Sequence, residues 1–150
     1  MNLGRQIQDF LWIITIILTG LLGTDGWANE NKQSAFDLSP LDLVNQQSDG
    51  VLVIDIRRQQ EWIETGVLKG AKTITAFQKD GKLHPEFKAE FDILVPNLHT
   101  PFILYCRSGR RTGILRDALE KSLGFTQAMH LSGGIVAWKK VGKSLVTYTQ

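Results

Sequence analysis

The feature that most constrains the fold of this chain is the alternation of short apolar runs with stretches that have helical spacing. Residues 51–55 read Val-Leu-Val-Ile-Asp, with no polar residue before the last, and such a run is typical of a parallel strand covered on both faces. Further strands are expected at 71–75, 102–106 and 127–131. Because helical stretches separate them, the sequence predicts crossover connections and a parallel α/β sheet.

The expected helices lie between these strands. Ser39, Pro40 and Asp42 combine a capping serine, a proline at the first helical position and an acid three residues after the cap, so a helix is expected to run to about residue 47. Other helices are expected at 59–65, 85–93, 112–123 and 135–141. In open sheets of this class ligands bind beyond the carboxyl ends of the strands. Three loops follow such ends, at Asp55, Cys106 and Gly133-Gly134.

The only cysteine of the chain, Cys106, lies where an expected strand gives way to an expected helix. Backbone N–H groups in such a turn and the helix N-terminus form an anion-binding concavity, and Arg107, Arg110 and Arg111 add positive potential. A lone cysteine is most often a small buried apolar residue, but arginines are rarely buried unless paired. We therefore expect an electropositive rim and a reactive thiolate that receives anionic substrates.

Three segments occur here in a specific order and spacing. They are 51–57 with Glu61, Trp62 and Gly70-Ala71; the loop Cys106-Arg-Ser-Gly-Arg-Arg111; and Leu131-Ser-Gly-Gly134 with Trp138. Between residues 36 and 144 the chain thereby resembles the single-domain rhodaneses, a family of sulfurtransferases. The resemblance implies a rhodanese-like three-layer α/β fold, with a five-stranded, mainly parallel sheet flanked by helices. It also implies that Cys106 carries a persulfide between a donor such as thiosulfate or a persulfide and an acceptor such as cyanide or a thiol.

The catalytic residue expected from this resemblance is Cys106, and the rest of its loop is expected to bind substrate: Arg107, Ser108, Gly109, Arg110 and Arg111. Arg110 is about as well explained as a solvated surface charge. Asp55 and Arg57 are expected to form an ion pair with Glu61 that braces the loop, in preference to acting in catalysis. The chain departs from the usual family pattern at Val67, Lys69 and Ser144, and these departures bear on loop packing rather than on activity.

Two other functions compete with sulfur transfer as interpretations of this sequence. Protein tyrosine phosphatases have the loop arginine one position later, where this chain has Thr112. The shorter loop suits a persulfide better than a phosphate, and no aspartate is placed to protonate a leaving group. The alternative left open is a non-enzymatic rhodanese-like module that carries persulfide, senses redox state or docks to a partner. Retention of Cys106 favours the enzyme.

Residues 1–28 are expected to be a signal peptide that directs export, to the periplasm. A short polar start containing Arg5 precedes the apolar run 10–22, and Gly26 and Ala28 are small residues at the positions that determine cleavage. The run is about 13 residues, below the ~17–25 that span a bilayer. The alternative is an uncleaved membrane anchor through residues 10–22. Residues 29–34 would then be a disordered leader, and 35–150 the rhodanese-like domain.

Composition and net charge limit which classes of partner and cofactor are expected. The formal net charge is +2, and loss of residues 1–28 would change it by one unit, so a nucleic-acid partner is not expected. One thiol cannot form an internal disulfide, even in an oxidising compartment. No cofactor is expected, and no metal site, because the three histidines lie on separate elements without ligand spacing. They are His84, His99 and His130.

We predict that the exported protein begins at or near Asn29, because Ala28 ends the cleavage pattern that follows the apolar run. Intact-mass analysis of protein recovered from the exported fraction measures this directly. A membrane-bound chain that retains Trp12 would establish the anchor instead.

Overall fold

The computed structural model describes residues 35–149. The expected signal peptide (1–28), the alternative anchor (10–22) and the expected leader (29–34) lie outside the described residues. Within 35–149, no helix has both the length and the apolar character needed to cross a bilayer.

Five parallel strands form one sheet in this part of the chain, in the order β1-β5-β4-β2-β3. The strands are β1 (Asp37–Leu38), β2 (Leu52–Asp55), β3 (Lys72–Thr73), β4 (Phe102–Tyr105) and β5 (Ala128–Leu131). In the central pair Leu52 lies opposite Phe102 and Asp55 opposite Tyr105. The predicted parallel α/β sheet is confirmed. The residue pattern missed β1, because a two-residue strand shows no periodicity.

Five helices connect and cover these strands. They are α2 (Pro40–Ser48), α3 (Gln59–Thr65), α4 (Phe87–Leu94), α5 (Arg110–Leu123) and α6 (Gly134–Lys140). The predicted capping box is present at α2, where the Ser39 amide donates to Asp42 Oδ2 at 3.0 Å and the Asp42 amide donates to Ser39 Oγ at 3.2 Å. Helix α5 begins two residues earlier than expected, because Gly109 turns the chain directly into the helix with a φ of +83°.

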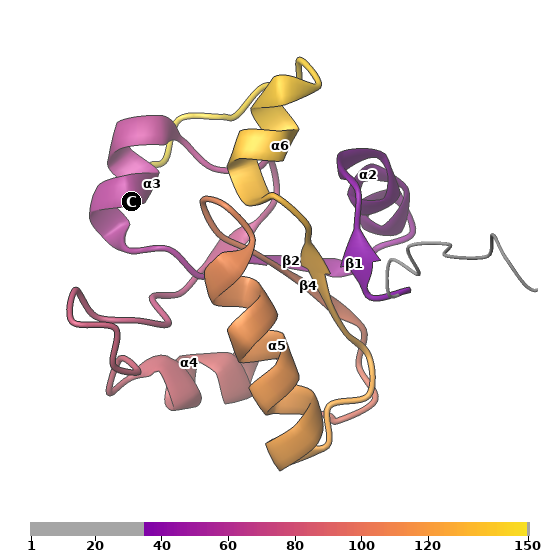
Figure 1. Cartoon of the computed structure of the whole chain (residues 1–150), viewed down its shortest axis with the longest axis vertical. Helices are drawn as coiled ribbons and strands as arrows, with labels where there is room; N and C mark the ends of the chain where they lie inside the picture. The colour runs from indigo at the N-terminus through magenta and orange to yellow at the C-terminus, as the bar shows by residue number, and fades with distance from the viewer. Residues whose placement is uncertain (1–34, 150) are drawn as a thin grey trace, which may run out of the picture. The chain divides into compact units, whose positions relative to one another are not determined.

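The sheet is covered on both faces, which explains the uninterrupted apolar strands. Along β4, Phe102 and Leu104 join a core cluster with residues of α4 and α5, whereas Ile103 and Tyr105 join a second cluster with residues of α2 and α6. In the view of Figure 1, α4 and α5 lie in the lower half of the molecule and α2 and α6 in the upper half. The structure is therefore a three-layer α/β/α arrangement.

The positions that depart from the usual family pattern are used in packing. Val67 is 7% exposed and pairs with Val146 in an antiparallel bridge, with N–O distances of 2.9 and 2.8 Å. The carbonyl of Lys69 accepts a 2.7 Å hydrogen bond from Gln47 Nε2. The carbonyl of Ser144 accepts a 2.9 Å bond from Trp138 Nε1. These contacts tie the loop after α3 to α2, and the C-terminal segment to α6.

Phe91 on α4 provides a test of the core. Its ring is 2% exposed and lies 5.3 Å from the Phe102 ring and 5.4 Å from the Phe125 ring, with both pairs near perpendicular. Phe91→Ala should lower the free energy of unfolding by about 3–5 kcal/mol, because it leaves a cavity against β4. Urea denaturation measures the loss. Ile93→Ala on the same helix is the control, since Ile93 is 80% exposed and should cost about 0.5 kcal/mol or less. Equal losses would contradict this core assignment.

Candidate functional site

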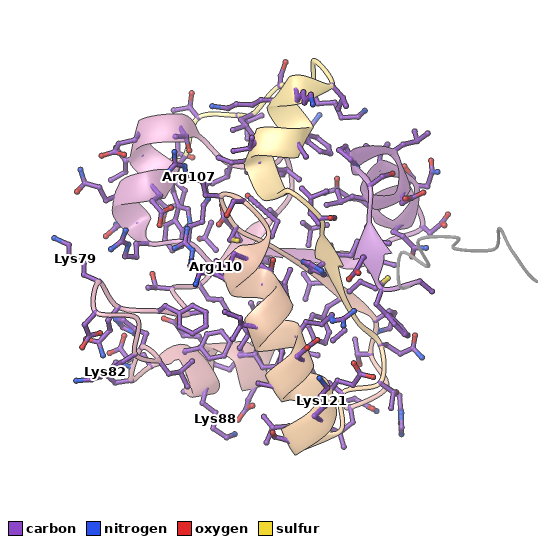
Figure 2. The ribbon with its side chains drawn as sticks, viewed as in Figure 1. Lys79, Lys82, Lys88, Arg107, Arg110 and Lys121 are labelled. Atoms are coloured by element: carbon purple, nitrogen blue, oxygen red, sulfur yellow. The ribbon has the colours of Figure 1, made fainter. Side chains whose placement is uncertain are left out.

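Cys106 directly follows β4, and its side chain is completely buried. It belongs to the core cluster that contains Leu104 and Leu115, so the thiol lies on the side of the sheet covered by α5. Its neighbours Arg107 and Arg110 are exposed, and Figure 2 shows Arg110 beside the first turn of α5 and Arg107 above it, toward α3. The site thus consists of an exposed cationic rim and a sulfur beneath it.

Two glycines permit the loop conformation. Gly109 is in the left-handed region, and a Cβ at this position would lie 2.8 Å from the amide nitrogen of Gly133. Gly134 also has a positive φ, of +56°, and a Cβ there would overlap the carbonyl groups of Cys106 and Arg107. Any larger residue would be strained at either position. The loop after β4 is therefore packed directly against the turn after β5.

The start of α6 orients the peptide groups of the cysteine loop. The amide of Ile135 donates to the Cys106 carbonyl at 3.0 Å, and the amide of Val136 donates to the Arg107 carbonyl at 3.1 Å. In a trans peptide the N–H points opposite to the C=O, so the amides of Arg107 and Ser108 point away from α6. That is the α5 side, where the Cys106 side chain lies.

Glu61 on α3 holds Arg111 of the cysteine loop. Arg111 Nη1 donates to Glu61 Oε2 at 2.9 Å, and Nη2 donates to Oε1 at 2.6 Å. Burial would raise the pKa of Glu61, but hydrogen bonds and positive charge from Arg111 and Arg58 outweigh it and lower the pKa to about 2. The pKa of Arg111 is raised by its hydrogen bonds to Glu61 and, to a smaller degree, by its interaction with Cys106. Arg111 is thus fixed at the start of α5 by a bidentate ion pair with Glu61 on α3.

A second, separate ion pair braces the strand ends. Arg57 and Asp55 are 1% and 0% exposed, and Arg57 Nη2 lies 2.6 Å from Asp55 Oδ2. Arg57 also donates to Thr65 Oγ1 at 2.6 Å and to the carbonyl oxygens of Gly66 and Glu61 at 2.7 and 3.2 Å. The expectation that the Glu61 carboxylate joins this pair is wrong. Arg57 reaches only the Glu61 backbone, because that carboxylate points toward Arg111 and Arg58.

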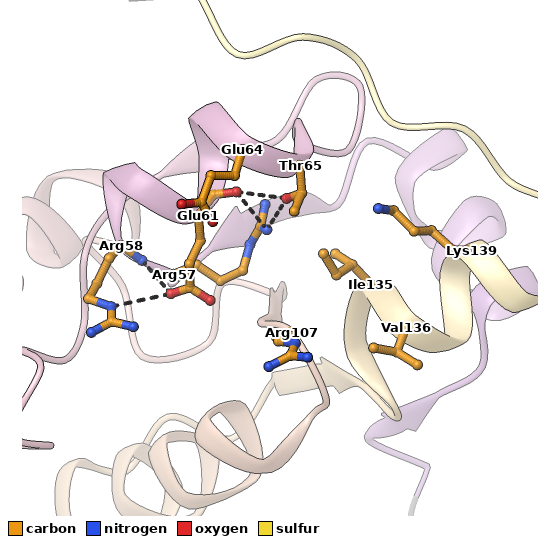
Figure 3. A pocket seen from close by; sticks show the side chains of 9 residues that line it. All are labelled: Arg57, Arg58, Glu61, Glu64, Thr65, Arg107, Ile135, Val136 and Lys139. Carbon is orange, nitrogen blue, oxygen red and sulfur yellow. Dashed lines mark hydrogen bonds and ion pairs between the residues drawn. The ribbon is translucent and has the colours of Figure 1, made fainter.

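Two pockets flank the Glu61–Arg111 pair. The first, about 450 Å³, is lined by Arg57, Arg58, Glu61, Glu64, Thr65, Arg107, Ile135, Val136 and Lys139, and Figure 3 shows Arg107 facing it between α3 and α6. The second, about 410 Å³, is lined by Arg58, Phe77, Gln78, Lys79, Gly81, Arg110, Arg111 and Ile114. Basic side chains outnumber acidic ones in both, so small anions are the ligands that the rim suits.

Sequence reasoning missed a chain of polar side chains behind the sulfur. Thr112 Oγ1 lies 3.8 Å from Cys106 Sγ and 3.1 Å from His130 Nδ1, and His130 Nε2 lies 2.8 Å from Asp37 Oδ1. The available signal was the presence of polar residues where the helix and strand patterns place core residues.

The other two histidines lie away from this path, because His84 and His99 contact other residues. Among residues 35–149, no group of three or more His, Cys, Asp or Glu side chains could hold a metal ion.

Comparison with known proteins agrees with this arrangement. A Drosophila melanogaster protein, rhodanese domain-containing protein CG4456, is 29% identical over 91 residues, which cover 59% of this chain and 81% of that protein. The probable adenylyltransferase/sulfurtransferase MoeZ of Mycobacterium tuberculosis is 50% identical over 38 residues, which cover 25% of this chain and 9% of the relative. The solved structure of the human single-domain sulfurtransferase TSTD1 matches with a TM-score of 0.52 and 26% identity, covering 71% of this chain and 97% of that one.

The family model for the rhodanese-like domain matches residues 39–141. This range begins at the cap of α2 and ends just after α6, so it includes the cysteine loop and the Gly133-Gly134 turn that supports it. The five-stranded parallel sheet, the loop and the match over most of the chain agree, and the chain therefore belongs to the rhodanese-like domain family.

Proposed function

We propose that this protein is a sulfurtransferase that moves sulfane sulfur from thiosulfate, or from a persulfide donor, to a thiol or cyanide through a persulfide on Cys106. The observation that carries the proposal is the position of Cys106, buried at the start of a loop whose first two carbonyl groups are bound to α6 and whose exposed rim carries Arg107 and Arg110. Membership of the rhodanese-like family and similarity to sulfurtransferases support a role in sulfur transfer or persulfide chemistry.

The reaction has two displacements at sulfur. In the first, the Cys106 thiolate attacks the outer sulfur of thiosulfate; an Sγ–S bond forms, the S–S bond of thiosulfate breaks, and sulfite leaves with the electron pair. In the second, the acceptor attacks the outer sulfur of the persulfide, and the Cys106 thiolate is regenerated. With cyanide as acceptor the product is thiocyanate. The chain's own contribution is to hold anions, through the loop amides and arginines.

The arginines divide into two groups. Arg111 is paired with Glu61, and its pKa responds to Cys106, so we assign it to orienting the loop and stabilising charge at Cys106. Arg107 and Arg110 form no ion pair with a described residue, and each lines a pocket. Their charges remain available to an anionic donor. We assign the anionic group of the donor to Arg107, which directly follows Cys106 and faces the first pocket.

Thiosulfate should add one sulfur, about 32 Da, to Cys106, and cyanide should remove it with formation of thiocyanate. Intact-mass spectrometry before and after each reagent measures both steps. Cys106→Ser should abolish both, because a hydroxyl neither ionises nor bonds sulfur at neutral pH. If the folded wild-type protein takes up no sulfur although its thiol reacts with a small alkylating reagent, transfer from thiosulfate is wrong. The non-enzymatic carrier, sensing or docking module then becomes the better interpretation.

Arg107→Ala should weaken use of thiosulfate by about 1.5–3 kcal/mol, or roughly 10- to 150-fold in kcat/KM, if its guanidinium donates a charge-assisted hydrogen bond to the donor. Steady-state kinetics with thiosulfate as the varied substrate measure this. Arg110→Ala is the matched control, because it removes the same charge from the other pocket and should cost less. Equal losses in the two variants would show that only general positive potential matters, and not the pocket.

A further inference from the structure

A continuous polar path runs from the sulfur of Cys106 through the core to the edge of the sheet. It passes from Cys106 Sγ to Thr112 Oγ1, to the His130 ring and then to Asp37 Oδ1, at distances of 3.8, 3.1 and 2.8 Å. Thr112 is completely buried and the side chain of His130 is 12% exposed. Solvent therefore competes little for the inner hydrogen bonds, and their donors and acceptors must be satisfied by one another.

When His130 is neutral, the side chains along this path carry too few polar hydrogens to make a hydrogen bond at every one of these contacts. Thr112 Oγ1 also lies 2.9 Å from the carbonyl of Gly109, which can only accept. The Asp37 carboxylate can only accept as well, so it fixes a hydrogen on His130 Nε2. A neutral ring then has a bare Nδ1, and the single hydroxyl hydrogen of Thr112 must serve it. An imidazolium carries hydrogen on both nitrogens and leaves the hydroxyl hydrogen free.

We propose that Asp37, His130 and Thr112 form a proton relay that takes the thiol proton of Cys106. With the thiol present and His130 neutral, the S–H donates to Thr112 Oγ1 and the hydroxyl donates to His130 Nδ1. The hydroxyl passes its proton to Nδ1 and receives the thiol proton. The products are a Cys106 thiolate that accepts a hydrogen bond from Thr112 and a His130 imidazolium that donates to Thr112 and Asp37. No proton is gained or lost, and the Gly109 carbonyl keeps its 2.9 Å bond from the Gly113 amide.

The charges around His130 suit this transfer. Asp37 comes from β1, and its Oδ1 is shared with Arg116 Nη1 of α5 at 3.2 Å. Arg116 is in turn held by Asp117 at 2.8 Å, also on α5. From β4 the neighbour paired with His130 is Leu104, which carries no charge. The Asp37 carboxylate therefore stabilises the positive charge that forms on the His130 ring. The opposing charge of Arg116 is partly neutralised by Asp117.

This inference rests on the proposed function only in taking Cys106 as the reacting atom. Thr112 contacts that atom, whereas His130 and Asp37 act through Thr112 and are positioning residues. The relay can be measured without any sulfur donor, by the rate at which iodoacetamide alkylates Cys106 as a function of pH.

Thr112→Val keeps the shape of the side chain and removes the hydroxyl, and His130→Asn removes the proton acceptor. Each should lower the alkylation rate at pH 7 about tenfold or more, which corresponds to about 1.4 kcal/mol. Thr112→Val removes the hydrogen bond to the thiolate, and His130→Asn removes the group that takes its proton. Each should therefore move the pH of half-maximal rate upward. Thr112→Ser should restore the rate to within about twofold. His99→Gln, at an exposed histidine, is the control and should leave the profile unchanged.

The double variant Thr112→Val with His130→Asn separates a relay from a simple charge effect. If His130 acts through Thr112, the second substitution should add nothing to the first. Additive losses, or profiles that do not move in either single variant, would overturn the relay. If wild-type protein takes up no sulfur but these profiles move as expected, the proposed transfer is wrong and the relay stands.

A second measurement does not need a reagent to reach the buried sulfur. The imidazole NMR signals of His130, followed against pH, should titrate differently in wild-type protein and in Cys106→Ser, because the serine hydroxyl does not release a proton to the relay. Identical titrations would overturn the proposal, even if Thr112→Val fails to fold.

Discussion

The two hydrogen bonds from the start of α6 to the carbonyl groups of Cys106 and Arg107 determine the form of the whole site. They fix the orientation of two successive peptide groups, and so direct the amides of Arg107 and Ser108 away from α6. They require the backbone of α6 to approach the loop so closely that position 134 tolerates no Cβ. The parallel sheet makes this approach feasible, because β4 and β5 are neighbours and both end at the same edge.

Two of the arginines in the site are paired with carboxylates, and this pairing determines where positive charge remains exposed. Arg57 and Arg111 are each bound to a carboxylate, Asp55 and Glu61, at distances of 2.6 Å. These pairs order the end of β2, the helix α3 and the cysteine loop relative to one another. A buried charge that loses its partner is strongly destabilising, so the two acids belong to the architecture as much as to the chemistry. Arg107 and Arg110, which form no ion pair within residues 35–149, remain exposed on the rim.

Sequence patterns were sufficient for the elements with strong periodicity or clear end signals. Helix α3 has the predicted bounds, and β4 and β5 differ from prediction by one residue each. The strand β1 was missed, because two residues carry no pattern. The loop residues were found from their order and spacing, whereas the partner of Glu61 was not. Arg111 lies 50 residues further along the chain, and which of several nearby arginines it meets depends on how α3 packs.

The path behind the sulfur was beyond sequence reasoning for the same reason. Asp37 and His130 are 93 residues apart and meet only because β1 pairs with β5 in one register. A shift of one residue would turn the His130 side chain to the other face of the sheet. Local patterns report how each strand is covered, but not which polar side chains become neighbours across it.

The complete burial of Cys106 limits which molecules can contact its sulfur before and after the proposed loading with sulfur. A persulfide lengthens the side chain by one S–S bond, about 2.05 Å, and carries its reactive atom outward toward the rim. In the persulfide form that we propose, a bulky partner thiol would reach the outer sulfur without ever touching Sγ. The unloaded thiol, by contrast, stays out of reach of large thiols and disulfides. Loading with sulfur would therefore make the reactive sulfur more accessible. The unloaded cysteine would react only with a small donor, and the persulfide could also react with a large acceptor.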